Sequence, residues 1–251
     1  MPPITLHMVL ARSVAAALGE EELRLEEPAY LLGSTTPDIR VITRQDRYST
    51  HFFDLEGPDH QDSVQAFFEA HPELADPGAL NPATRAFVAG YLSHLVFDEQ
   101  YITQVYRRLF AAHERLGGAV RANLMDRLLQ FDMERSATDP ELRRTLARAL
   151  GATIENIRIG FIEPETLDRW REVARDVAQR DMDWERVRAM IANHLRRAGI
   201  GEEAELVSFL DSLPALLDET MAYVSDEQVR AYLERSSEAA AATIARYLGC
   251  G

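Results

Sequence analysis

Hydrophobic residues recur at steps of three and four along almost the whole chain, which is the periodicity of amphipathic α-helices. Alternation typical of β-strands does not extend over any useful length. The pattern therefore predicts an all-α fold with many helices. We expect helices over residues 6–18, 63–70, 81–115, 119–132, 140–150, 164–180, 184–198, 202–224 and 226–248.

Boundary signals support two of these helices in particular. Asn81 followed by Pro82 is a good start, because Asn caps a helix and Pro suits its first position. Ser225 and Gln228 form a capping-box pattern at the start of the last helix. Residues 20–62 are predicted to be irregular apart from a short helical piece at 29–32, and long irregular segments inside compact domains are often functional.

The length fits one sizeable core. A chain of 251 residues can bury about 70% of its extended surface on folding. Hydrophobic residues make up 46% and charged residues 27%, which is ordinary for a globular protein. Because no linker or repeat interrupts the pattern, we expect a single all-α domain over residues 1–251, with 151–251 as a possible C-terminal helical subdomain.

Charge narrows the classes of partner. The formal net charge is −14, so general binding to nucleic acid or to anionic membranes is not expected. All 27 basic residues are arginine, and without lysine a Schiff-base enzyme or a phosphate-loop NTPase is excluded.

The single cysteine, Cys250, excludes a disulfide framework within one chain. No apolar run reaches 18 residues and the first residues lack signal-peptide features, so we expect a cytoplasmic protein without a membrane span.

The candidate chemistry lies on the helix predicted at 81–115. His94 and Asp98 fall one turn apart on its apolar stripe, so both are expected to point into the core. A buried carboxylate is costly unless it is paired or bound to a metal, and histidine is a natural companion ligand. Gly90 costs this helix about 1 kcal/mol relative to alanine, which indicates close approach by another backbone or a ligand.

Three further residues can join this pair. His7 is expected on the buried face of the first helix, whereas Asp38 and His51 fall in the segment predicted to be irregular. Three imidazoles and two carboxylates suit Zn²⁺ or another first-row metal. A buried hydrogen-bonded His–Asp couple without metal, with core histidines elsewhere, is the alternative that the spacing leaves open.

These residues stand in a familiar order. The relevant stretches are Met1-Pro2…His7, Gly33…Pro37-Asp38, Thr50-His51-Phe52 and Gly90-Tyr91-Leu92-Ser93-His94-Leu95-Val96-Phe97-Asp98. Over roughly the first 100 residues the chain resembles the zinc-dependent phospholipase C family, which is related to the single-strand-specific zinc nucleases. The most specific part is the helix that carries Gly-Tyr followed by His-x-x-x-Asp.

The resemblance implies an all-α fold around a multi-zinc cluster that hydrolyses phosphodiesters. For this chain we expect one to three zinc ions, with another first-row divalent metal as the alternative. By position, Asp38, His51, His94 and Asp98 correspond to ligands of one zinc. His7 corresponds to a ligand of a second zinc, with Asp98 as the bridge. Asp38 also corresponds to the candidate general base.

The chain departs from this family in two places. Secreted members use a mature N-terminal tryptophan as a ligand, whereas this chain begins Met-Pro-Pro. Members also carry a later His…His-x-x-x-Glu set, but after Asp98 only His113 and His194 remain, and both suit a solvated surface. Acidic or histidine substitutes could complete a further metal site, although a solvated surface is the simpler interpretation of all of them: the candidates are Asp126, Asp132, Glu134 and His60.

We therefore predict a metal-dependent phosphoric ester hydrolase that uses metal-activated water, with zinc as the expected ion. The acidic surface favours a small or zwitterionic phosphate ester over a polyanion. The alternative is a non-catalytic helical binding or scaffold protein that retains a structural or regulatory metal. Helical phosphohydrolases with an adjacent His-Asp doublet and serine hydrolases with a Gly-x-Ser-x-Gly elbow are excluded, because neither motif occurs.

Overall fold

The computed structural model describes residues 2–58, 61–197, 199–200 and 202–249. These residues form helices joined by turns, and none of them is in a β-strand, so the predicted all-α fold is confirmed. None of the helices in this part of the chain is both long and apolar enough to cross a membrane. The α-helices are α1 Ile4–Leu18, α2 Glu21–Leu25, α3 Glu27–Gly33, α4 Arg40–Thr43, α5 Tyr48–His51, α6 Ser63–Ala70, α7 Pro82–Tyr101, α8 Ala119–Ala137, α9 Pro140–Ala149, α10 Pro164–Gln179, α11 Trp184–Arg197, α12 Glu203–Tyr223 and α13 Asp226–Leu248.

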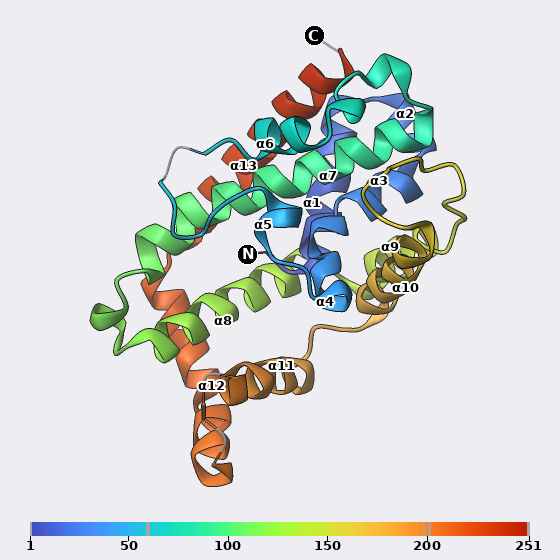
Figure 1. Cartoon of the computed structure of the whole chain (residues 1–251). Helices are drawn as coiled ribbons and strands as arrows, with labels where there is room; N and C mark the ends of the chain where they lie inside the picture. Colours follow the sequence, from blue (N-terminus) through green and yellow to red (C-terminus); the bar gives the residue numbers. More distant parts are fainter. Residues whose placement is uncertain (1, 59–60, 198, 201, 250–251) are drawn as a thin grey trace.

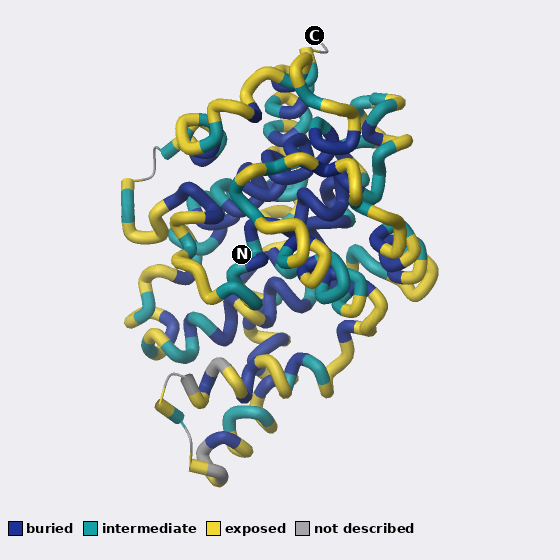
Figure 2. Tube along the Cα trace, turned by 45° about the vertical axis from the view of Figure 1, so that its right-hand side comes forward, coloured by how far each residue is buried: buried dark blue, intermediate teal, exposed yellow. Residues whose placement is uncertain are grey.

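Helix α7 forms the centre of the molecule (Figure 1). It packs most extensively against α3 and α13, and α1 crosses it while also contacting α8, α10 and α13. The tube in Figure 2 shows the buried residues running through this central region. Sixteen of the twenty residues of α7 are buried, so almost every side chain on this helix faces protein. His94 and Asp98, which lie on this helix, are therefore buried in the core.

Two glycines allow α3 and α7 to approach closely. A Cβ atom built on Gly90 would lie 2.0 Å from the carbonyl oxygen of Tyr30, and one on Gly33 would lie 2.0 Å from that of Phe87. Real atoms do not approach so closely, so both positions require glycine. Of the two reasons expected for Gly90, close approach by another backbone or by a ligand, the first is confirmed.

The long helix predicted at 81–115 is not continuous, which corrects the sequence-based expectation. The α-helix α7 ends at Tyr101 and continues as the nine-residue π-helix η4, Ile102–Phe110, before the 3₁₀ turn η5, His113–Leu116. At the end of η4 the amide of Ala111 donates to the carbonyl of Tyr106, five residues earlier. Hydrophobic spacing over so few residues does not distinguish a π-helix from an α-helix, because the two periods differ by less than one residue per turn.

The segment at 20–62 contains more helix than expected. Helices α2, α3, α4 and α5 and the 3₁₀ turn η1, Thr36–Ile39, occupy much of it. Each has seven residues or fewer, which is too short for hydrophobic periodicity to register. Such short helices are not stable alone, so tertiary packing against α7 and its neighbours must hold them. The predicted capping box at Ser225 and Gln228 is present at the start of α13.

Candidate metal centre

Four elements bring five side chains to one buried point beside α7. Helix α1 contributes His7, η1 contributes Asp38, α5 contributes His51, and α7 contributes both His94 and Asp98. Their ligand atoms form two groups, in each of which the atoms lie within 4.8 Å of one another. One group is His7, His94 and Asp98, and the other is Asp38, His51 and His94. The sequence placed these residues up to 91 positions apart, and the tertiary fold gathers all of them.

Asp98 lies at the centre of this cluster. Its Oδ1 is 3.3 Å from His7 Nε2, and its Oδ2 is 3.4 Å from His51 Nε2 and 3.8 Å from His94 Nε2. Asp38 contacts the cluster through His51, because its Oδ1 lies 3.6 Å from His51 Nε2. The rings of His7 and His94 stack with their centroids 3.7 Å apart. These nitrogen-to-oxygen separations exceed the roughly 2.7–2.9 Å of charge-assisted hydrogen bonds.

The cluster leaves several buried polar atoms without a hydrogen-bond partner. These atoms are Nε2 of His7, His51 and His94, Nδ1 of His7 and Oδ1 of Asp98. Each unpaired buried group costs on the order of 1–3 kcal/mol, and a folded protein rarely retains several at one point. Imidazole nitrogens and carboxylate oxygens that converge without bonding one another are the donors that a divalent first-row cation prefers. The residues present therefore fit a metal ion.

Neighbouring groups orient two of the three imidazoles. His94 Nδ1 lies 2.8 Å from the backbone oxygen of Ser34, and because a carbonyl only accepts, this nitrogen carries the proton. The hydroxyl of Thr50 donates to the backbone oxygen of Arg47 and so accepts from Nδ1 of His51 at 2.9 Å. In both rings the lone pair is left on Nε2, facing the cluster. Outer hydrogen bonds of this kind are typical of histidines that ligate metal.

Electrostatics keeps His94, Asp98 and Asp38 in the protonation states that a metal requires. Burial, together with the neighbouring His7, lowers the pKa of His94 to about 3, so this ring is neutral. Burial alone would raise the pKa of Asp98, but its contact with His7 and the nearby His94 and His51 outweigh burial and hold that pKa well below its usual value. Burial is likewise outweighed at Asp38, where the contact with His51 lowers the pKa. Both carboxylates are ionised at neutral pH.

Sequence reasoning missed Arg47, which contacts this cluster through Asp98. It immediately precedes α5, and its Nη2 donates to Asp98 Oδ2 at 2.9 Å while its Nη1 donates to the backbone oxygen of Phe53 at 3.0 Å. The Arg47 side chain is only 11% exposed. Arg47 is one of the 27 arginines of the chain, and it lies in the segment that the sequence predicts to be irregular. No spacing distinguishes it from the other arginines.

The acidic residues considered for a further metal site have other partners. The two carboxylate oxygens of Asp126 accept from the Tyr101 hydroxyl and from Gln130 Nε2, each at 2.7 Å. Glu134 forms a buried ion pair with Arg143 at 3.1 Å, and Asp132 pairs with Arg135 at 2.6 Å. Among the described residues, none of these three carboxylates joins a group of potential metal ligands.

The remaining histidine candidates do not extend the cluster in the part of the chain that the structure describes. His113 is half-buried in η5, with its Nε2 3.5 Å from the Tyr106 hydroxyl, and it belongs to neither ligand group. His60 lies outside the described residues, and so does the side chain of His194. The solvated-surface interpretation of those two residues stays a prediction.

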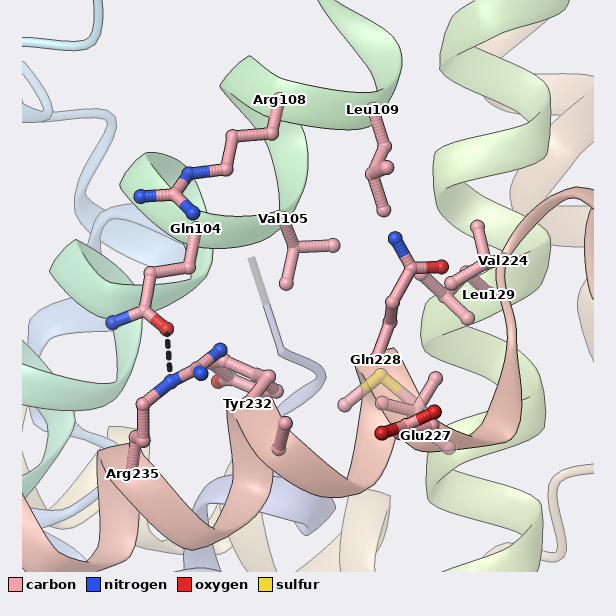
Figure 3. A pocket seen from close by; sticks show the side chains of 13 residues that line it. Gln104, Val105, Arg108, Leu109, Leu129, Val224, Glu227, Gln228, Tyr232 and Arg235 are labelled. Atoms are coloured by element: carbon pink, nitrogen blue, oxygen red, sulfur yellow. Dashed lines mark hydrogen bonds between the residues drawn. The ribbon is translucent and has the colours of Figure 1, made fainter.

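A cavity of about 270 Å³ lies apart from the metal cluster, between η4, α8 and α13 (Figure 3). The side chains of Arg108 and Arg235 reach toward it, and Arg235 Nε donates to Gln104 Oε1 at 2.9 Å. Tyr232 also lines the cavity and donates to the backbone oxygen of Phe97 at 3.2 Å. None of the five cluster residues lines this cavity.

One comparison with known proteins bears on the cluster. The sequence model of the family described as zinc dependent phospholipase C matches residues 6–100, which is less than half of the chain. This range contains all five cluster residues, and also Arg47. No curated protein and no solved structure matches the chain.

Proposed function

We propose that this protein is a zinc-dependent hydrolase of phosphoric esters, similar in its chemistry to the phospholipase C family that matches residues 6–100. One observation carries the proposal: three imidazole nitrogens and a carboxylate oxygen, all buried and without hydrogen-bond partners, converge beside a second carboxylate. Without a bound ion such a set would destabilise the core, because the protein would be more stable if each atom had a hydrogen-bond partner or were replaced by an apolar group.

In this proposal His51, His94, Asp38 and Asp98 hold one ion, and His7 supplies a further nitrogen on the far side of Asp98. A bound Zn²⁺ supplies Lewis acidity, which brings the pKa of water toward neutrality and stabilises charge on phosphorus. Ser34 and Thr50 keep the two rings of His94 and His51 turned with Nε2 toward the cluster. The protein thereby supplies a rigid set of donors.

Asp38 is the proposed general base. Its side chain is 17% exposed, whereas those of the other four cluster residues are between 0% and 3% exposed. Reactants therefore reach the cluster most easily from the side of Asp38. The pKa of Asp38 is lowered, so the carboxylate is ionised and can orient a water molecule or accept its proton.

A small or zwitterionic phosphate ester is the proposed substrate class. A net charge of −14 disfavours polyanions at long range, and a nuclease would need a basic groove with stacked aromatic side chains. A neutral or zwitterionic leaving group avoids this repulsion, whereas the phosphate group itself can meet the local positive charge of the metal centre.

A non-catalytic protein with a structural metal is the second candidate function. It is favoured by the pairing of Asp126, Asp132 and Glu134 with other side chains, which leaves no second acidic metal site in the described residues. The two functions differ in turnover, because a structural site is coordinatively closed whereas a catalytic site keeps an open position.

The test combines metal analysis with a hydrolysis assay. We expect the purified full-length chain to contain zinc by elemental mass spectrometry and to hydrolyse bis(4-nitrophenyl) phosphate or 4-nitrophenyl phosphorylcholine. A chelator should abolish turnover, and added zinc should restore it. Bound zinc without turnover of either ester would favour the structural role, and absence of any metal after reconstitution would reject both candidate functions.

The variant Asp38→Asn should distinguish the role of Asp38 as general base from its role as metal ligand. Asparagine retains an oxygen that can bind zinc but cannot take a proton, so we expect kcat to fall about 100-fold or more while zinc remains bound. The matched control is Asp46→Asn in the same segment, where asparagine can still accept from the amide of Tyr48. We expect that control to change kcat by less than about twofold. An unchanged kcat in Asp38→Asn would show that another group accepts the proton.

A further inference from the structure

We propose that Arg47 supplies, at Asp98, the positive charge that a second metal ion would otherwise supply, so that the centre holds one divalent ion per chain. The proposal rests on the metal centre described above and defines its composition. It follows from three observations: the position of the guanidinium, the single lone pair of a shared histidine, and the charge of the buried cluster.

The guanidinium of Arg47 is fixed between two acceptors. Nη2 donates to Asp98 Oδ2 at 2.9 Å, and Nη1 donates to the backbone oxygen of Phe53 at 3.0 Å. The Asp98 side chain is 3% exposed, so water screens this ion pair little. Arginine stays protonated under all conditions in which a protein is folded. Asp98 therefore has a permanent cation on the same oxygen that approaches His51 and His94.

The two ligand groups cannot both be completed, because they share His94. Nδ1 of His94 is protonated toward the oxygen of Ser34, which leaves one lone pair on Nε2. A carboxylate can bridge two ions, but one imidazole nitrogen binds only one. When His94 binds an ion together with Asp38 and His51, the described residues leave only His7 and Asp98 Oδ1 for a second ion. Two protein ligands are fewer than the three or four of typical zinc sites.

The charge of the cluster also favours a single ion. Histidines are neutral and carboxylates are ionised when they ligate a metal, so the two carboxylates and the guanidinium give the ligand set a net charge of minus one. One divalent ion changes this to plus one, and a second would change it to plus three. In a buried site with little solvent, an excess of three positive charges is strongly unfavourable. Without the guanidinium, two ions would leave a smaller excess.

The first test is the number of ions in the wild-type protein. The full chain is stripped with chelator, titrated with zinc alone by calorimetry, and analysed for zinc by elemental mass spectrometry after gel filtration. We expect one zinc per chain. Two or more tightly bound ions would overturn this inference and leave the proposed hydrolase intact, whereas no binding would overturn both. The number of ions and the turnover are separate readouts, so the two failures are distinguishable.

The second test asks whether the charge of Arg47 acts on the ion. In Arg47→Gln the side chain can still donate to Asp98 but carries no charge, so we expect zinc to bind about tenfold more tightly. Arg47→Lys keeps the charge and should stay within about threefold of wild type. If Arg47 only positioned Asp98, zinc affinity in Arg47→Gln would fall instead of rise, because a less firmly positioned Asp98 would bind zinc more weakly. Weaker or unchanged binding in Arg47→Gln would therefore overturn the inference.

Arg44→Gln is the matched control. Arg44 is an exposed residue three positions earlier, and the same substitution there removes the same charge from the surface. Because exposed charges are screened by salt, we expect its zinc affinity to equal that of wild type. Circular dichroism melting curves of all four proteins exclude unfolding as the cause of any difference.

Discussion

Replacing His94 by alanine is expected to remove both metal binding and turnover. His94 belongs to both groups of potential ligands, so without it each group keeps only two of its three members. Loss of an outer hydrogen bond to a ligand typically costs 10–100-fold in metal affinity or activity. Loss of the ligand itself should weaken zinc binding by about 1000-fold or more. Elemental mass spectrometry and the bis(4-nitrophenyl) phosphate assay measure the two effects on the same preparation.

His113→Ala provides the control for this substitution. His113 is half-buried in η5 and belongs to neither ligand group, so zinc content and turnover should both match wild type. A melting curve for each variant shows whether it is folded. If folded His94→Ala retained wild-type zinc content, the metal would be bound elsewhere and the proposed centre would be wrong.

Gly90→Ala is expected to cause the largest loss of stability among the predicted changes. In an ordinary helix interior this substitution stabilises by about 1 kcal/mol. Here the new Cβ would lie 2.0 Å from the carbonyl oxygen of Tyr30 and 2.8 Å from the amide nitrogen of Ser34, both of them backbone atoms. Backbone atoms of a packed helix cannot move aside as a flexible side chain can, so α3 and α7 must separate. We expect a net destabilisation of about 3 kcal/mol or more.

The effect of Gly90→Ala should also reach the metal centre. Ser34 follows α3 and its backbone oxygen accepts from His94 Nδ1, so displacing α3 disturbs the orientation of that ring. For a chain of this size the melting temperature should fall by roughly 6–12 °C, and zinc binding should weaken in the same variant.

Gly160→Ala is the matched control for the packing effect. A Cβ atom added to Gly160 would have no other atom within 4 Å, and Gly160 does not adopt a positive φ. We expect the stability of this variant to lie within about 0.5 kcal/mol of wild type. Equal melting temperatures for wild type and Gly90→Ala would mean that the two helices can separate at little cost, contrary to the packing argument.

Local spacing was sufficient to predict most of the helices and part of the site. Hydrophobic residues at three- and four-residue steps identified the long helices, since a helix buries one face at that period wherever it packs. The same rule placed His94 and Asp98 together inside the core, because both lie on α7 one turn apart. The sequence also indicates a special role for Gly90, because the loss of helix stability that glycine causes is local to its own helix. The structure was needed to identify the backbone of Tyr30 as the group that approaches Gly90.

Only the tertiary structure decided what surrounds that pair. His7, Asp38 and His51 come from separate elements, and the short helices of segment 20–62 form only when packed, so spacing could not predict their positions. The same holds for Arg47 on Asp98 and for Gln130 and Tyr101 on Asp126. The sequence by itself therefore determined the helices and the inward-facing residues of each one. Tertiary packing determined which of those residues meet and which carboxylates are left with room for a metal, because that depends on contacts between segments far apart in the chain.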